Sequence, residues 1–169
     1  MFKPYAKTGE RSHDEQEFLE QLGSLLEPSL GKASLRITSL ANASALLFWY
    51  LDRVNWVGFY IRDTDSAKGM DRLVLGPFQG LPACTSIGYG KGVCGTCWAT
   101  GQTQRVADVH AFPGHIACDG SSRSEVVVPV VLEGAIVAVL DIDSPELDRF
   151  STEDVAFLQM VGHLIASVW

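Results

Sequence analysis

The stretch Val126–Leu140 reads VVVPVVLEGAIVAVL, and it constrains the fold more strongly than any other part of the chain. Two apolar, largely β-branched runs flank Glu133-Gly134, a two-residue spacing that is typical of a tight β-hairpin. Pro129 has no amide hydrogen to donate, so we expect it to face away from a neighbouring strand or to lie at a bulge. The sequence therefore predicts an antiparallel hairpin here.

Helical spacing of apolar residues marks both ends of the chain. A first pattern spans Ser12–Pro28, and a second spans Gly31–Leu51. A last helix is predicted after Ser151, whose side chain suits an N-cap, and Asp154 three residues later complements the helix dipole.

Between the helices, Asn55–Ile61 has strand character, and we expect Leu73–Phe78 to be its hairpin partner. Glycines and prolines then interrupt Gly76–Gly95, which is typical of a loop. A short helix is expected over Val93–Thr100 and a brief strand over Gln102–Val106. Residues 107–124 lack periodicity and predict a long ordered loop, a feature that is usually functional in a compact domain.

Hairpins with helices at both ends of the chain favour an α+β fold built on a central antiparallel sheet. We expect the N- and C-terminal helices to cover one face of that sheet and the site-forming loops to cover the other. The length of 169 residues fits one domain spanning residues 1–169.

The composition excludes several classes of protein. Hydrophobic residues make up 47% and charged residues 20%, which argues against disorder. The net charge of -7 would repel nucleic-acid phosphates and anionic membranes. No run reaches the roughly 18 apolar residues of a membrane helix, and Met1–Lys7 is not followed by the apolar run of a secretory signal. We expect a cytoplasmic protein without nucleic-acid or membrane partners.

Four cysteines, Cys84, Cys94, Cys97 and Cys118, gather in the predicted loop region. Thiols stay reduced in the cytosol, so this gathering indicates a site rather than a disulfide framework. A cysteine is also often a small buried hydrophobe, and we expect this of Cys97, which follows Cys94 by three residues on the short helix.

Two other interpretations of the cysteines are weaker. Zinc held by the cysteines with His110 and His115 would normally require two closely spaced pairs, and the chain has only Cys94–Cys97. A thioredoxin-like pair would follow a strand in a strand–helix–strand unit, which is not predicted. We expect no metal and no organic cofactor.

A reactive thiol with resolving partners is the remaining interpretation. Cys118 lies near His115 and Arg123, and positive neighbours lower a thiol pKa, whereas Asp119 acts in the opposite direction. Cys84 and Cys94 lie on the glycine-rich loop, which can bring a second sulfur close. A sulfenic acid on one cysteine condenses readily with a neighbouring thiol.

Three carboxylates are expected at one end of the Val126–Leu140 hairpin. Glu125 opens its first strand, while Asp141 and Asp143 close the second on the same face. The cluster is either a solvated strand edge or a pocket for a cationic group such as a substrate ammonium. Crowded carboxylates raise one another's pKa, so a protonated member could act as a general acid.

The chain closely resembles the free methionine-(R)-sulfoxide reductases, a family built on the GAF fold. The resemblance covers most of the chain and rests on Asn55–Tyr60, Gly76–Gly80, Pro82–Cys84, Gly90–Thr96, Val109–Asp119, Ser124–Pro129 and Leu140–Ser144.

The resemblance implies a role for each candidate. Cys118 would be the nucleophile, and Cys84 and Cys94 would be its resolving or recycling partners. The three carboxylates would hold the substrate ammonium or deliver a proton, and Trp56 and Tyr60 would pack on the methyl-sulfoxide end. The family usually has a small residue where this chain has Cys97.

These expectations combine into one hypothesis. Free methionine-(R)-sulfoxide enters a pocket under the loop Gly80–Gly92, and backbone amides of that loop take its carboxylate. Cys118 attacks the sulfoxide sulfur, a protonated carboxyl group helps the oxygen leave, and Cys118 becomes a sulfenic acid. Cys84 or Cys94 condenses with it, and a thioredoxin-like dithiol restores the thiols. The alternative is a GAF-type small-ligand or redox sensor without turnover. The resemblance also makes a homodimer plausible, with pairing through Glu153–Trp169.

Overall fold

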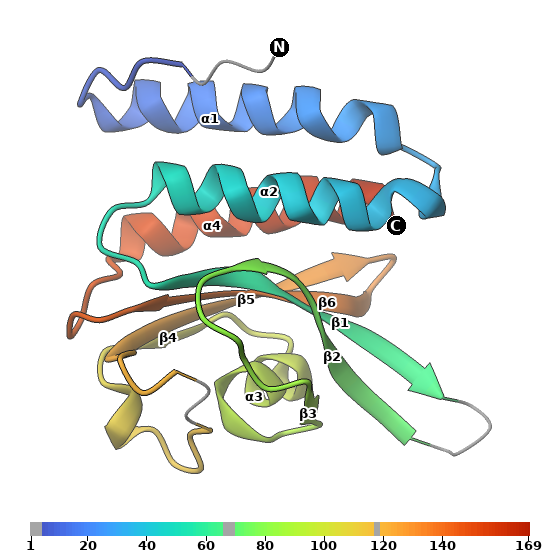
Figure 1. The fold of residues 1–169 in the computed structure, drawn as a ribbon, viewed down its shortest axis with the longest axis vertical. Helices are drawn as coiled ribbons and strands as arrows, with labels where there is room; N and C mark the ends of the chain where they lie inside the picture. The colour runs from blue at the N-terminus through green and yellow to red at the C-terminus, as the bar shows by residue number, and fades with distance from the viewer. Residues whose placement is uncertain (1–4, 66–69, 117–118) are drawn as a thin grey trace.

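A six-stranded antiparallel sheet in the order β3-β2-β1-β6-β5-β4 forms the centre of the structure (Figure 1). The computed structural model describes residues 5–65, 70–116 and 119–169. The strands are β1 (Trp56–Asp65), β2 (Met70–Gln79), β3 (Ser86–Gly88), β4 (Gln104–Val106), β5 (Ser124–Leu132) and β6 (Ala135–Ser144). The two central strands, β1 and β6, therefore come from hairpins that are far apart in the sequence.

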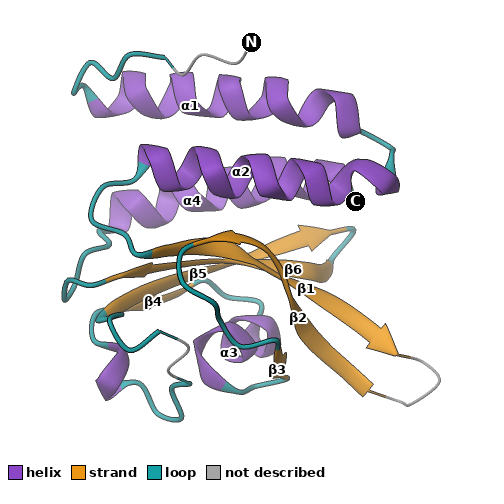
Figure 2. Ribbon diagram, viewed as in Figure 1, coloured by secondary structure: helices purple, strands orange, loops and turns teal. Residues whose placement is uncertain are grey.

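Helices form layers on both faces of the sheet (Figure 2). The α-helices are α1 (Arg11–Leu26), α2 (Arg36–Tyr50), α3 (Gly92–Thr100) and α4 (Thr152–Ile165), and 3-10 turns occupy Glu27–Ser29, Ala33–Leu35, Val109–Ala111 and Ala166–Val168. Helices α2 and α4 pack on one face, and α3 with the long loops lies on the other. The predicted α+β architecture is confirmed, with the refinement that α1 packs on α2 and α4 instead of on the sheet.

The hairpin of β5 and β6 forms as its sequence predicts. Glu133 and Gly134 have φ values of 48° and 81°, and two consecutive positive values are what a two-residue type I′ turn requires. The pairing runs from Leu132 opposite Ala135 to Ser124 opposite Ser144. One irregularity lies between Val130 and Val131, where the pairing passes over Val137, so the extra residue lies on β6 and the bulge is not at Pro129. Pro129 lies opposite Val139 and beyond the residues of β5 that pair with β4.

Burial on both faces explains why β5 is a continuous apolar run. Val126, Val128 and Val130 enter a core between the sheet and helices α1, α2 and α4. Val127 enters a second core between the sheet and α3. A strand covered on both sides needs no polar alternation, so the hydrophobic period of two is absent.

The core beneath the helices is rich in aromatic and leucine side chains. Phe18 of α1, Tyr50 of α2 and Phe157 of α4 form a cluster with ring centroids 4.8–5.3 Å apart. Helix α4 begins with the predicted cap: Ser151 Oγ accepts from the Asp154 amide at 3.2 Å, and Asp154 Oδ2 accepts from the Ser151 amide at 2.8 Å. This capping box fixes the start of the helix that closes the core.

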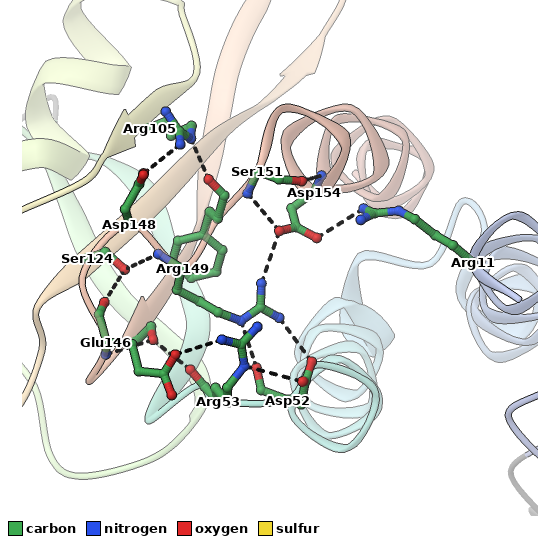
Figure 3. A network of polar contacts seen from close by, with 12 residues as sticks. Arg11, Asp52, Arg53, Arg105, Ser124, Glu146, Asp148, Arg149, Ser151 and Asp154 are labelled. Atoms are coloured by element: carbon green, nitrogen blue, oxygen red, sulfur yellow. Dashed lines mark hydrogen bonds and ion pairs between the residues drawn. The ribbon is translucent and has the colours of Figure 1, made fainter. Parts of the chain in front are cut away.

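A polar network joins the helix layer to the ends of the central strands (Figure 3). The guanidinium of Arg149, only 6% exposed, donates to Asp52 at 3.1 Å and to Asp154 at 3.0 Å. Arg11 donates to the other oxygen of Asp154 at 3.0 Å. The corner after α2, the start of α4 and the start of α1 are thereby connected.

Three details differ from the sequence prediction. The glycine-rich segment contains a short strand, β3, which pairs with β2. Strand β1 continues four residues beyond Ile61 to Asp65. The long loop contains the 3-10 turn Val109–Ala111, where Asp108 accepts from the His110 amide. Within the described residues, no helix combines the length and apolarity that crossing a membrane requires.

Candidate functional site

A small cavity of about 30 Å³ opens on the α3 side of the sheet. It lies where the ends of β5 and β6 meet the first turn of α3 and the long loop. Its described lining consists of Tyr60, Ile87, Lys91, Gly92, Val93, Cys94, His115, Ile116, Asp119, Ser122, Glu125, Asp141 and Asp143. Polar groups and apolar walls thus converge on one space.

The three predicted carboxylates converge in this cavity. Antiparallel register places Glu125 opposite Asp143 and Val127 opposite Asp141, so all three acids share the face that looks toward α3. Glu125 is 6% and Asp141 7% exposed, and Asp143 is half-buried. The expected convergence is confirmed, and the solvated-edge interpretation is excluded by this burial.

Burial determines the protonation of the cluster. Desolvation raises the pKa of Asp141 to about 6. Desolvation, followed by repulsion from Asp141, raises the pKa of both Glu125 and Asp143 well above their usual range. Three carboxylates that cannot all ionise together hold at least one proton near neutral pH, which gives the cavity a proton donor.

Cys94 lies beside this cluster in the first turn of α3. Its Sγ, one oxygen of Glu125 and one oxygen of Asp141 all lie within 4.8 Å of one another. Burial raises the pKa of the Cys94 thiol well above its usual range, and the charges of Asp141 and Glu125 act in the same direction. Cys94 is therefore a protonated thiol at neutral pH and a poor nucleophile.

Cys97 is a buried core residue, as predicted, and it is not part of the described lining of the cavity. It is fully buried, and its Sγ–H donates to the Val127 carbonyl at 3.6 Å. Burial raises the pKa of its thiol to about 12. A free thiol in this position behaves as a small hydrophobe.

The loop that follows β2 holds Cys84. Cys84 is half-buried and disulfide-bonded, while Cys94 and Cys97 are free thiols. The hydroxyl of Tyr60 donates to the Cys84 carbonyl at 3.0 Å, and Trp56 Nε1 donates to the Leu81 carbonyl at 3.0 Å. Two side chains of β1 thereby hold this loop at two points.

The two aromatic candidates occupy different positions. Tyr60 lines the cavity, whereas Trp56 is not part of its described lining. The Trp56 ring is 2% exposed and stacks between Tyr60, at 6.1 Å, and Phe78, at 5.3 Å. Tyr60 is therefore the ring of β1 that faces the cavity, and Trp56 supports it from behind.

Cys118, the expected nucleophile, lies outside the described residues. The described part of the same loop brings His115 to the cavity, with its Nε2 at 4.0 Å from Glu125 Oε2. Burial lowers the pKa of His115, and the neighbouring His110 acts in the same direction. His115 is thus mostly neutral at physiological pH, and it does not neutralise the acids.

Sequence reasoning missed a hydrogen-bonded group at the rim of the cavity. The Asn55 amide nitrogen donates to Asp119 Oδ2 at 2.9 Å and to Ser122 Oγ at 3.0 Å. Asp119 Oδ1 accepts from the Ser121 amide at 2.8 Å, and this bond lowers the pKa of the Asp119 carboxyl. The spacing of Asp119 and Ser121 is typical of a local turn. It is the sequence signal from which an ordered rim could have been predicted.

The sequence analysis also gave no separate role to Lys91, which is the only lysine or arginine in the described lining. Its side chain is exposed, whereas Glu125 and Asp141 in the same lining are buried. A cavity lined by both acids and a cation matches the two opposite charges of a zwitterion.

Comparison with known proteins identifies the family of the chain. A family model described as a GAF domain matches residues 12–169. The free methionine-R-sulfoxide reductase of Escherichia coli is 51% identical over 129 residues, covering 76% of this chain and 74% of the relative. The Saccharomyces cerevisiae protein of the same name is 41% identical over 158 residues, covering 90% and 86%.

The fold of this chain is also similar to that of a solved structure. The free methionine-R-sulfoxide reductase of Neisseria meningitidis, solved in complex with its substrate, superimposes with a TM-score of 0.87 at 38% identity, covering 99% of this chain and 95% of that one. The GAF-like fold expected from the sequence is confirmed.

Proposed function

We infer that this chain, which belongs to the GAF-domain family of the free methionine-R-sulfoxide reductases, reduces free methionine-(R)-sulfoxide to methionine. The observation that carries the proposal is the convergence of Glu125 and Asp141, both buried, with the half-buried Asp143 in one small cavity. A protein rarely buries neighbouring acids, because their desolvation is costly without a compensating cation. A substrate ammonium supplies that cation.

Recognition follows from charge. The ammonium of the free amino acid contacts the acids, and its carboxylate contacts Lys91 and the backbone amides of the glycine-rich loop. The methyl-sulfoxide end packs against Tyr60, with Trp56 behind it. A methionine sulfoxide within a peptide carries neither terminal charge at that residue, so this cavity refuses it.

The chemistry begins at Cys118. Its sulfur attacks the sulfoxide sulfur while a protonated carboxyl group donates a proton to the sulfoxide oxygen. The substrate gains two electrons and leaves as methionine, and Cys118 loses two electrons and becomes a sulfenic acid. The raised pKa of Cys94 supports Cys118 as the nucleophile, since Cys94 is held as a protonated thiol.

Cys84 is the resolving residue in this proposal. Its thiol attacks the sulfenic sulfur of Cys118, which forms a disulfide and releases water. The support is that Cys84 is disulfide-bonded in the structure, while Cys94 and Cys97 are free thiols. A thioredoxin-like dithiol then reduces the disulfide, which requires a reducing compartment such as the cytoplasm.

The decisive experiment couples turnover to thioredoxin, thioredoxin reductase and NADPH. With free methionine-(R)-sulfoxide, the wild type consumes NADPH continuously and Cys118→Ser does not. Cys97→Ser is the matched control and keeps turnover, because Cys97 is not part of the described lining of the cavity. The (S)-epimer and a peptide-bound sulfoxide leave NADPH unchanged. Substrate binding by the wild type without NADPH consumption would favour a GAF-type sensor instead.

A second experiment tests the carboxylates. Asp143→Asn removes one charge from the ammonium site while keeping the side-chain shape, so we expect KM to rise at least tenfold, the equivalent of about 1.4 kcal/mol. Unchanged kinetics in a folded Asp143→Asn protein would rule out the carboxylate pocket.

The homodimer remains a prediction. Pairing through Glu153–Trp169 would place α4 at the interface, and light scattering of the purified chain measures the mass that decides it.

A further inference from the structure

We propose that the base of this cavity is also a binding site for Zn²⁺ or a similar thiophilic divalent cation, with Cys94, Glu125 and Asp141 as ligands. The ion acts as an inhibitor that occupies the place of a substrate ammonium, and it is not a cofactor. Binding of the ion stands independently of the reductase activity, whereas the inhibitory consequence rests on the proposed function.

The geometry of the three side chains fits a common centre. Cys94 comes from α3, Glu125 from β5 and Asp141 from β6, and their ligand atoms lie within 4.8 Å of one another. Zinc bonds of about 2.0–2.3 Å place two ligands of a tetrahedral site roughly 3.3–3.7 Å apart. The adjustment of about an ångström is available from side-chain rotation, chiefly of Glu125, which has three rotatable bonds.

A second, independent observation points to a missing partner. Asp141 is 7% exposed, and among the described residues its Oδ1 has no hydrogen-bond donor. A buried carboxylate oxygen without a donor is rare, because desolvation is then uncompensated. The unpaired oxygen belongs to the same group that Cys94 and Glu125 surround, so a bound cation would satisfy it.

The charge of the site favours a cation, and its donor types favour zinc. In the described part of the chain, no lysine or arginine forms an ion pair with Glu125 or Asp141, and the imidazole of His115, 4.0 Å from Glu125, has a lowered pKa. Sulfur and carboxylate oxygen together suit zinc better than magnesium or calcium, which prefer oxygen alone.

The coordination number distinguishes this site from a structural zinc site. Structural sites have four protein ligands, and among the residues that the structure describes three come together here. Cys97, one turn further along α3, donates to the Val127 carbonyl and is not part of this group. The fourth position is open to water or to the imidazole of His115, which lines the same cavity. An open site of this kind exchanges its ion, as reversible inhibition requires.

The test separates this site from the reactive cysteines. The chain has four cysteines, so Cys84→Ser/Cys118→Ser leaves only Cys94 and Cys97 as thiols. We expect this double variant to bind one Co²⁺ with a thiolate-to-cobalt charge-transfer absorption, and one Zn²⁺ in competition with a chromophoric chelator. Adding Cys94→Ser abolishes the absorption and weakens zinc binding at least tenfold, and adding Cys97→Ser changes neither.

Two further arms keep the result interpretable. In the same double variant, Asp141→Asn weakens zinc binding at least tenfold, and circular dichroism confirms that each variant is folded. Excess free methionine-(R)-sulfoxide displaces Co²⁺ from the double variant, which cannot turn over. A charge-transfer band that survives Cys94→Ser, or disappears in Cys97→Ser, overturns the site. A band that substrate does not diminish overturns the inhibitory role. Neither result depends on NADPH-coupled turnover, so the two proposals fail separately.

Discussion

At the scale of single residues, the acids in the cavity carry most of the chemical information. Their positions could be predicted, because a period of two and a two-residue turn fix which residues of a hairpin lie opposite each other. Their burial could not be predicted, since it depends on α3 and the long loop packing over the strand ends. The same limit applied to Asn55, which contacts Asp119 and Ser122 across more than sixty residues of sequence.

The three acids make the free energy of unfolding depend on pH, and their raised pKa values give the direction of that dependence. Their folded-state pKa values lie above the unfolded ones, so the folded protein binds more protons, and stability is lost as pH rises. We expect the free energy of unfolding to fall between about pH 4 and about pH 7, with Asp141 contributing on the order of 3 kcal/mol. The lowered pKa of His115 opposes this trend, and so do the lowered pKa values of carboxyl groups such as Asp14 and Asp119 at the acidic end of the range.

Urea unfolding as a function of pH measures this effect. Glu125→Gln, which removes one acid and leaves a neutral side chain of similar shape, flattens the slope and stabilises the protein near neutral pH. A wild type that grows more stable over the same range would contradict the protonated cluster.

At the scale of elements, α3 is the piece that turns a sheet edge into a cavity. Its presence and its end at Gly101 were predictable, because glycine with a φ of 68° ends a helix at low cost. Strand β3 was not predictable, since a three-residue strand carries too little pattern and depends on pairing with β2. Both elements meet at Gly95, where an added Cβ would lie 2.4 Å from the Gly88 carbonyl oxygen.

Gly95→Ala therefore tests the packing of α3 against the β3 turn. The clash is with backbone and cannot be relieved by side-chain rotation, so we expect a loss of about 1–3 kcal/mol of stability. We also expect reduced turnover, because Gly95 follows Cys94, which lines the cavity. Thermal unfolding followed by circular dichroism gives the first value. Gly120→Ala is the control, since its added Cβ meets nothing within 4 Å. Equal stability of the two variants would refute the close contact.

At the scale of the whole molecule, the sheet separates two hydrophobic cores that have different roles. The core beneath α1, α2 and α4 supplies stability, while the core beneath α3 positions the cavity. The arginine network in Figure 3 ties the helix layer to the strand ends, and it joins residues that no local pattern relates, such as Asp52 and Arg149. The order of the layers can thus be predicted from the sequence, but long-range polar contacts of this kind cannot.

Replacing Arg149, the central residue of this network, measures how much the network stabilises the folded protein. Arg149→Met leaves Asp154 without one of its donors, and we expect a loss of about 2–3 kcal/mol, because the guanidinium is buried. Arg53→Met is the matched control: the pair of Arg53 and Glu146 is half-exposed on both sides and contributes under about 1 kcal/mol. Chemical denaturation of both variants compares them directly, and a loss in Arg149→Met no greater than in Arg53→Met would contradict the connecting role.

The bond from the Trp56 indole to the Leu81 carbonyl has one more consequence. It attaches a buried chromophore to the loop that holds Cys84, the proposed resolving residue, so any rearrangement of that loop alters the polarity around the ring. Intrinsic tryptophan fluorescence then reports each redox transition in real time, without a label and without a coupled enzyme.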